Sequence, residues 1–273
     1  MSWELTADLE AFASAAEEFL RSRPVQHTVF LTLIDTLRRR GLHAYGPGEP
    51  VFGFWRGPSG AVLLQTPPHP MMFSALPAGA VPAAVEALAD RPLTGVNLVA
   101  DDIDEFVAGR KTAATVKMRT RLYLLDTLVP PAAPGGRSRT ATADDRDLLL
   151  RWHAEFYDEI GEEHSGDFGA AVDDRIGYGG VVLWEDDGRP VSMAVRSRLG
   201  AGMVRVQMVW TPKEFRGRGY AGAATTVATR DALDLGAAAV VLVTDLANPT
   251  SNGLYQRLGY QPIEDRVVVE FRE

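Results

Sequence analysis

The chain has 273 residues, of which 46% are hydrophobic and 23% charged, and its formal net charge is -8. This composition predicts a folded globular protein, and the length favours two domains over one long domain. The acidic balance argues against non-specific binding to nucleic acid and favours a cationic or amine-bearing partner.

The chain contains no cysteine, which excludes disulfides, thiolate metal sites and cysteine nucleophiles and agrees with a reducing compartment. Its first twenty residues carry five acidic side chains, so we expect neither a signal peptide nor a membrane-spanning helix there. No lysine stands in a phosphate-binding GK[ST] loop, and His153 and His164 lack the spacing of a metal site. We therefore expect a cytoplasmic protein without a bound metal and without a membrane or nucleic-acid partner. Its oligomeric state stays open.

In the first half of the chain, periodic apolar residues predict two helices, then three strands, then helices and strands in alternation. In chain order these are helices at 7–20 and 27–40, strands at 51–55, 61–66 and 71–75, a helix at 81–89, a strand at 96–99, a helix at 103–107 and a strand at 120–125. Residues 129–137 then combine proline and glycine in a way that neither a helix nor a central strand tolerates. We place a linker there, between domains at 1–128 and 138–273.

The second half predicts one strand, two helices, three strands joined by hairpin turns, and then helix, strand, helix and strand. The ranges are 139–142, 144–160 and 168–176, 181–185, 191–198 and 203–211, and finally 219–235, 240–244, 248–258 and 267–271. The first half repeats this order from its helices onward, although no residue motif repeats with it. The sequence therefore predicts an α/β fold of two similar modules in tandem, each with a mixed, mostly antiparallel sheet flanked by helices.

A basic, glycine-rich turn between the strand at 203–211 and the helix at 219–235 is the strongest chemical signal. It reads Arg216, Gly217, Arg218, Gly219, Tyr220, Ala221. Such a turn presents unpaired backbone N–H groups at the positive end of a helix, and glycine lets a ligand approach the backbone closely. The turn is suited to binding a pyrophosphate.

This turn resembles the signature [RQ]-x-x-G-x-[GA] of the GNAT superfamily of N-acetyltransferases, with Arg216, Gly219 and Ala221 at the defining positions. A second region, residues 244–260, is similar to the family's N-x-x-[SA]-x-x-[LF]-Y-x-[KR]-x-G-[FY] pattern. Its matching residues include Asn248, Ser251 and Tyr255.

Within that second region, Asn252 and Tyr255 are three residues apart on a predicted helix, so we expect them to share a polar, accessible face. The resemblance covers about residues 140–271, and it covers the first half only by the order of its elements. Residues 1–128 contain no basic glycine-rich turn that enters a helix. The resemblance therefore implies that the first module has lost coenzyme binding and shapes the substrate cleft or the domain interface.

For the second module the resemblance implies acetyl-coenzyme A as cofactor, with residues 216–221 on its diphosphate. It further implies that the parted strand ends near 209–211 and 244–246 hold the pantetheine arm. Backbone N–H groups near Val209, Trp210 and Thr211 would polarise the thioester carbonyl. Tyr255 would protonate the departing thiolate, because a phenol of pKa near 10 lies close to the pKa of a thiol.

The sequence departs from the family pattern at the general base. Many members carry a glutamate on the strand before the signature turn, whereas residues 203–210 offer Arg205 and Gln207 and no carboxylate. The base therefore stays open among Glu155, Glu159, Glu185, His153 and a chain of water molecules. Two hypotheses remain: an acetyltransferase in which a primary amine, a small molecule in preference to a protein, attacks directly in a ternary complex, or a non-catalytic coenzyme A-binding regulatory protein.

Overall fold

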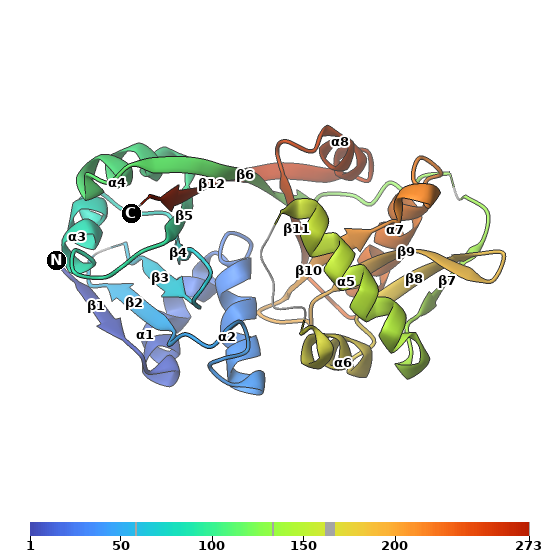
Figure 1. Cartoon of the computed structure of the whole chain (residues 1–273), viewed down its shortest axis with the longest axis horizontal. Helices are drawn as coiled ribbons and strands as arrows, with labels where there is room; N and C mark the ends of the chain where they lie inside the picture. Colours follow the sequence, from blue (N-terminus) through green and yellow to red (C-terminus); the bar gives the residue numbers. More distant parts are fainter. Residues whose placement is uncertain (58, 133, 162–166, 273) are drawn as a thin grey trace. The chain divides into compact units, whose positions relative to one another are not determined.

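The computed structural model of the chain describes residues 1–57, 59–132, 134–161 and 167–272, so His164 lies outside the described residues (Figure 1). The chain divides into two compact units. The first unit comprises Met1–Leu122, Val243–Pro249 and Pro262–Glu273, and the second comprises Tyr123–Leu242 and Thr250–Gln261. The expected division at residues 129–137 keeps each domain continuous in sequence, whereas the first unit includes residues from the C-terminal end of the chain.

The first unit begins with a short strand, β1, that the sequence pattern did not predict. The elements that follow agree with the predicted order. In chain order they are β1 (Trp3–Thr6), α1 (Leu9–Ser22), α2 (Thr28–Arg40), β2 (Val51–Trp55), β3 (Val62–Gln65), β4 (Met71–Phe73), α3 (Ala80–Ala87), β5 (Gly95–Val99), η1 (Ala100–Asp102), α4 (Ile103–Arg110) and β6 (Ala114–Leu125). The last strand of the chain, β12 (Tyr260–Phe271), belongs largely to this unit.

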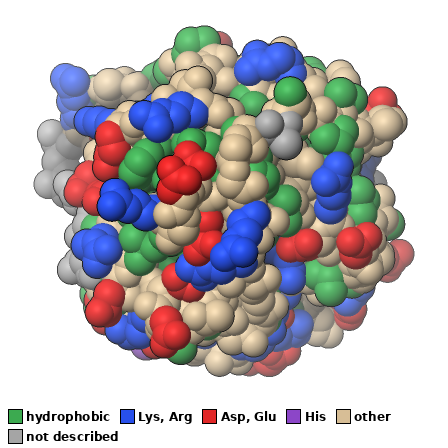
Figure 2. Space-filling model, turned by 90° about the vertical axis from the view of Figure 1, so that its right-hand side faces the viewer, with side chains coloured by type: hydrophobic (Ala, Val, Ile, Leu, Met, Phe, Trp, Pro, Cys, Tyr) green, Lys and Arg blue, Asp and Glu red, His purple; other side chains and the backbone are tan. Residues whose placement is uncertain are grey.

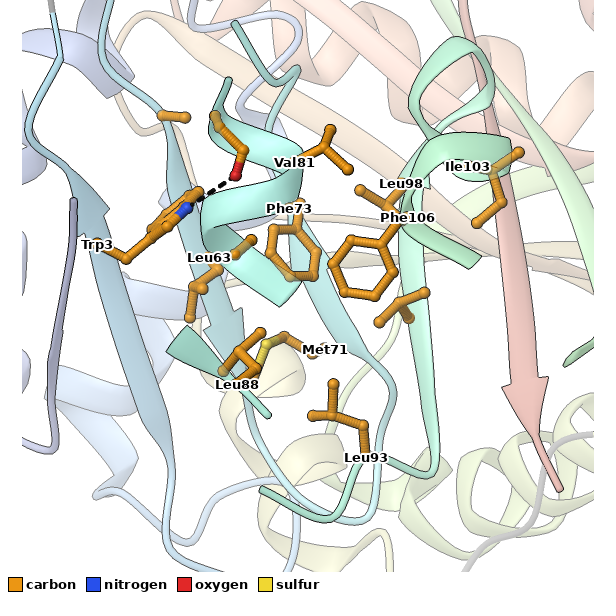
Figure 3. Close-up of a cluster of buried hydrophobic side chains, with 14 of the residues drawn as sticks. Trp3, Leu63, Met71, Phe73, Val81, Leu88, Leu93, Leu98, Ile103 and Phe106 are labelled. Carbon is orange, nitrogen blue, oxygen red and sulfur yellow. Dashed lines mark hydrogen bonds between the residues drawn. The ribbon is translucent and has the colours of Figure 1, made fainter. Parts of the chain in front are cut away.

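The strands of the first unit lie in the order β1-β2-β3-β4-β5-β12. Neighbours run antiparallel, apart from the parallel pair β4 and β5. Helices α1 and α2 bury their apolar faces on one side of the sheet, and α3 and α4 cover the other. On the second side, Trp3 donates from its indole to the carbonyl of Ala80 at 3.0 Å, which ties β1 to the start of α3 (Figure 3).

The second unit contains the predicted succession of strand, two helices, three strands, helix, strand and helix. These are β7 (Arg137–Thr140), η2 (Ala143–Asp145), α5 (Arg146–Ile160), α6 (Gly169–Gly177), β8 (Val181–Asp186), β9 (Arg189–Arg196), β10 (Met203–Trp210), η3 (Lys213–Phe215), α7 (Tyr220–Asp234), β11 (Ala239–Asp245) and α8 (Pro249–Arg257). The turn between β8 and β9 has positive φ angles at Asp187 and Gly188, which suits a tight hairpin and confirms the antiparallel pairing expected there.

The strand order in the second unit is β7-β8-β9-β10-β11, antiparallel except for the parallel pair β10 and β11. Helices α5 and α6 cover one face of this sheet, and α7 and α8 pack on the other. The first five strands of the first unit and the five strands of the second unit therefore have the same order and direction, and each unit is a mixed α/β fold with a mostly antiparallel sheet flanked by helices. Across the described ranges, no helix has both the length and the apolar character needed to cross a membrane.

Candidate functional site

The central strands β10 and β11 pair over only three residues each. Their parallel register runs from Met203 opposite Ala239 to Arg205 opposite Val241. Further along β10, the register with β9 shifts between Gln207 and Trp210, where Met208 has a φ of +47°. A bulge of this kind bends a strand, and a left-handed non-glycine residue costs about 1–3 kcal/mol. The bend therefore lies in the part of β10 that leads to the glycine-rich turn.

The predicted contact residues Val209, Trp210 and Thr211 follow this bulge. The Ser192 hydroxyl donates to the carbonyl of Trp210 at 3.0 Å, and the Arg216 Nε donates to the carbonyl of Thr211 at 2.8 Å. The Trp210 side chain is only 6% exposed, and its indole N–H has no hydrogen-bond partner among the described residues. The backbone carbonyls of Trp210 and Thr211 thus already accept hydrogen bonds within the protein, whereas the buried indole N–H of Trp210 has no acceptor among the described residues.

The glycine-rich turn is open on its outer side. Gly217 and Gly219 have φ angles of +75° and +86°, the left-handed region that only glycine adopts without strain. A Cβ atom on Gly217 would meet nothing within 4 Å, and one on Gly219 would meet only Pro134, at 3.9 Å. Space is therefore available for a ligand to lie against this backbone.

Helix α7 begins at this turn without a side-chain cap, because its N-cap residue is Gly219. The first hydrogen bond into the helix runs from the Ala223 N–H to the Gly219 carbonyl, at 3.1 Å. The preceding N–H groups, those of Tyr220, Ala221 and Gly222, receive no acceptor from the described residues. Three free donors at the positive end of a fifteen-residue helix fit an anionic group such as a diphosphate.

The side chains of the turn are partly engaged within the protein. Arg216 forms an ion pair with Glu159 of α5 at 2.7 Å, and its guanidinium lies 5.0 Å from the centre of the Trp210 ring. Both partners of this ion pair are more than a third exposed, so its contribution to stability is small. Tyr220 donates its hydroxyl to Asp186, the last residue of β8, and this bond raises the pKa of the tyrosine. The backbone of Tyr220, rather than its side chain, therefore faces the expected ligand.

Helix α8 carries the second group of predicted residues. Tyr255 is 8% exposed and its ring meets Tyr260 edge-on at 6.2 Å. Burial first, and the neighbouring Tyr260 second, raise the pKa of Tyr255. Asn252 accepts a hydrogen bond at 2.8 Å from the hydroxyl of Tyr123, a fully buried residue of β6. The expected free polar face is therefore wrong: the Tyr255 ring lies in the core, and the Asn252 amide oxygen has an internal donor.

The other two predicted residues of this region flank or begin α8. Asn248 directly precedes the helix and is exposed, and Ser251 lies in its first turn and is half-buried. Both take part in interactions within the protein. Their contact with the coenzyme stays a prediction.

The candidate bases are mostly engaged elsewhere. His153 is fully buried, with Nδ1 at 2.7 Å from the Leu149 carbonyl and Nε2 at 2.5 Å from Arg175. Burial and then the charge of Arg175 lower the pKa of His153 to about 3, so it stays neutral and its acceptor nitrogen is occupied. Glu185 lies 2.6 Å from Arg139, whose hydrogen bond lowers the pKa of the carboxyl. These contacts give His153 and Glu185 structural roles.

Two further carboxylates of α5 were candidates. Glu159 is held by Arg216, as described above, and Glu155 is exposed on the same helix. On β10, where many family members carry a glutamate, Arg205 donates to the Gln207 amide oxygen at 3.1 Å.

The sequence did not indicate a role for Ser192 or Tyr123. A serine within a strand and a tyrosine within an apolar run look like ordinary sheet residues, and only the fold shows that they bond to Trp210 and Asn252.

Comparisons with known proteins agree with this geometry. Residues 145–260 match the model of the acetyltransferase (GNAT) family. A GCN5-related N-acetyltransferase from Sphaerobacter thermophilus is 16% identical, covering 99% of this chain and 96% of that chain with a TM-score of 0.64. An acetyltransferase from the GNAT family from Colwellia psychrerythraea is 10% identical, covering 100% of both chains with a TM-score of 0.63.

A GCN5-related N-acetyltransferase from Kribbella flavida is 21% identical, with 89% of this chain and 96% of that chain covered and a TM-score of 0.56. At these identities the likeness shows the fold alone. No curated protein is a significant match to this chain. The family match over residues 145–260 nevertheless confirms the resemblance seen in the two motifs, and the chain carries an acyltransferase domain of the GNAT acetyltransferase family.

Proposed function

We propose that the second unit transfers an acetyl group from acetyl-coenzyme A to a primary amine by direct attack in a ternary complex. The observation that carries this proposal is the uncapped start of α7, where three N–H groups adjoin an open turn at the end of a bulged strand. Acetyl-coenzyme A, when bound, supplies the thioester carbonyl that the amine attacks. The lack of cysteine favours a single direct step over a thiol-bound intermediate on the protein.

The residues of the turn would hold the coenzyme by its diphosphate. The N–H groups of Tyr220, Ala221 and Gly222 donate to the phosphate oxygens, and the two glycines at 217 and 219 let those oxygens approach the backbone. Arg218 adds positive charge to the turn, as does Arg216, which is also paired with Glu159. Backbone N–H groups near Val209 would then polarise the carbonyl, since donors aimed at developing negative charge lower the barrier.

The proton balance assigns a role to Tyr255. The amine nitrogen bonds to the carbonyl carbon, the carbon–sulfur bond breaks, and the sulfur takes a proton from the Tyr255 hydroxyl, which solvent then restores. Because burial raises the pKa of Tyr255, this hydroxyl keeps its proton at neutral pH and can donate it. The proton lost by the amine passes to water or to the exposed Glu155, since His153, Glu185 and Glu159 are engaged and β10 offers no carboxylate.

For the acceptor we propose a small-molecule amine. The net charge of -8 favours approach of a cationic molecule. Figure 2 shows acidic and basic side chains interspersed over the face in view, without one broad basic area of the kind that nucleic acid requires.

The test follows thiol release from acetyl-coenzyme A in the presence of a panel of small amines. We expect turnover with at least one amine, and a fall in kcat of about 100-fold or more in Tyr255→Phe at an unchanged coenzyme Kd. Tyr260→Phe is the matched control, since it removes a neighbouring buried hydroxyl that bonds to Thr229 at 2.7 Å. Tight coenzyme binding with no thiol release across the panel would instead identify a binding protein.

A further inference from the structure

The first unit contains a parallel strand pair, β4 and β5, that corresponds to the pair β10 and β11 of the second unit. Strands β4 and β5 are the parallel pair of that unit, and their register ends at Met72 opposite Asn97. β4 then leads through residues 74–79 to helix α3, whose N-cap is Gly79 with a φ of +81°. Gly219 occupies the same place in the second unit with a φ of +86°. The backbone frame of the coenzyme site is thus present twice.

In the first unit this place is filled by a side chain. Arg266 of β12 is 9% exposed, and its Nη2 donates to the carbonyls of Phe73 at 2.5 Å and Asn97 at 3.1 Å. Phe73 is the last residue of β4, and Asn97 belongs to the last register pair with β5. The guanidinium therefore bridges the two parallel strands at the point where their ladder ends.

The remaining nitrogens of Arg266 are also satisfied. Nε donates to the Asn97 side-chain oxygen at 2.8 Å, and Nη1 donates to Glu264 at 3.0 Å. The side chains of Arg266 and Glu264 are only 10% and 14% exposed. The planar guanidinium carries donors on all three nitrogens and so reaches all of these oxygens, whereas the compact ammonium group of a lysine would not.

The carboxylate of Asp102 supplies a negative charge near the guanidinium of Arg266. The Asp102 carboxylate accepts a hydrogen bond at 3.1 Å from the N–H of Leu76, within the segment that joins β4 to α3. Asp102 is half-buried and its negative charge acts on Arg266. In the first unit, a backbone donor of the connecting segment and the carbonyls of the strand ends are therefore used within the protein.

We propose that Arg266 is the permanent internal occupant of the gap between β4 and β5, in a guanidinium site built from two backbone carbonyls, an amide oxygen and a carboxylate. The first unit consequently takes no coenzyme, and each chain binds one molecule of acetyl-coenzyme A. The C-terminal strand β12 completes the first unit by supplying this group. Removing the guanidinium leaves buried oxygens without donors, and such unpaired polar groups lower the stability of the folded protein.

Chemical rescue tests this site without any catalytic assay. We expect Arg266→Ala to lower Tm by about 5–10 °C, because an unpaired buried partner costs several times RT. Addition of about 50 mM guanidinium chloride, well below denaturing concentrations, should restore at least half of that loss, whereas equal sodium chloride or urea should not. The control is Arg56→Ala in the same unit, whose partner Glu4 is exposed and whose Tm should show no such rescue.

Two further measurements keep the proposal open to refutation if the alanine variant does not fold. Arg266→Lys retains the charge but not the fork, so its Tm should also fall by several degrees. Calorimetry of the wild-type chain with acetyl-coenzyme A should give one site per chain. Of these measurements, only the calorimetric one rests on the proposed function, since the Tm measurements do not involve the coenzyme. A Tm for Arg266→Lys equal to wild type, rescue of both alanine variants alike, or two coenzyme sites per chain would overturn the proposal.

Discussion

Substituting the two N-cap glycines, Gly219 and Gly79, separates the cost of backbone strain from the loss of a ligand. Their φ angles are +86° and +81°, and an added Cβ meets only Pro134 at 3.9 Å in one case and nothing within 4 Å in the other. Glutamate at either position therefore costs about 1–2 kcal/mol of stability through its left-handed backbone, with little steric clash. We expect Gly219→Glu and Gly79→Glu to lower Tm by similar amounts.

Coenzyme affinity should distinguish the two variants. A carboxylate at residue 219 stands where the diphosphate is expected, and two like charges about 4 Å apart repel by about 4 kcal/mol at an effective dielectric of 20. Solvent at this exposed turn reduces that figure, so we expect the Kd for acetyl-coenzyme A to rise by about 100-fold, and by less at high salt. Gly219→Gln has the same size without the charge and should show a smaller rise.

Isothermal titration calorimetry on the folded variants measures these differences. Gly79→Glu should bind acetyl-coenzyme A as the wild type does. Should Gly219→Glu retain the wild-type Kd within about twofold, or should the two glutamate variants lose affinity equally, the diphosphate does not lie at the start of α7.

Three other predictions follow from the same geometry. Because burial raises the pKa of Tyr255, the acetylation rate should keep rising with pH as the amine deprotonates, and a decline centred below pH 10 that disappears in Tyr255→Phe would contradict its role. Folded His153 binds a proton only near pH 3 whereas the unfolded chain binds it near 6.5, so this group should lower stability by about 1.4 kcal/mol for each pH unit between 6.5 and about 3. In urea titrations, the free energy of unfolding of His153→Gln should fall less steeply with decreasing pH than that of the wild type. Glu159→Gln breaks the exposed ion pair to Arg216 and should change the free energy of unfolding by less than about 1 kcal/mol in urea titrations, so a loss of several would refute its surface character.

The glycine-rich turn could be predicted from the sequence because its signals are local. A β-branched strand, a run of glycine and arginine, and a helix rich in small residues follow one another within thirty-two residues, from Met203 to Asp234. Each of these depends on backbone preference and side-chain periodicity rather than on distant partners. The structure has this order, with Gly219 as the N-cap where the helix was expected to begin.

Strand boundaries were less predictable where polar residues enter the sheet. β1 was not predicted, since Trp3–Thr6 is only four residues long and only Trp3 is buried. β12 was expected from residue 267 but begins at Tyr260, because Pro262, Glu264 and Asp265 interrupt its apolar pattern. Polar side chains on a strand hide its alternation, and only its pairing with a neighbouring strand shows that it is one.

Long-range pairing was not accessible from the sequence at all. β5 pairs with β12, so Val99 lies opposite Arg266, and nothing in either segment specifies a partner so far along the chain. For the same reason Arg266 received no attention, since a buried arginine contradicts the hydrophobic pattern on which core prediction depends. The availability of Tyr255 was misjudged on similar grounds: helical spacing places it beside Asn252, but only packing shows that its ring is buried.

Backbone amide chemical shifts during a titration with acetyl-coenzyme A test the central claim most directly. In ¹⁵N-labelled protein, the amides of Tyr220, Ala221 and Gly222 should show the largest saturable shifts, together with those of Gly217 and Gly219, because they donate to the diphosphate. The amide of Gly79, in the same backbone conformation, should not move. If the amides of residues 217–222 stay in place while the coenzyme binds, the start of α7 is not its site.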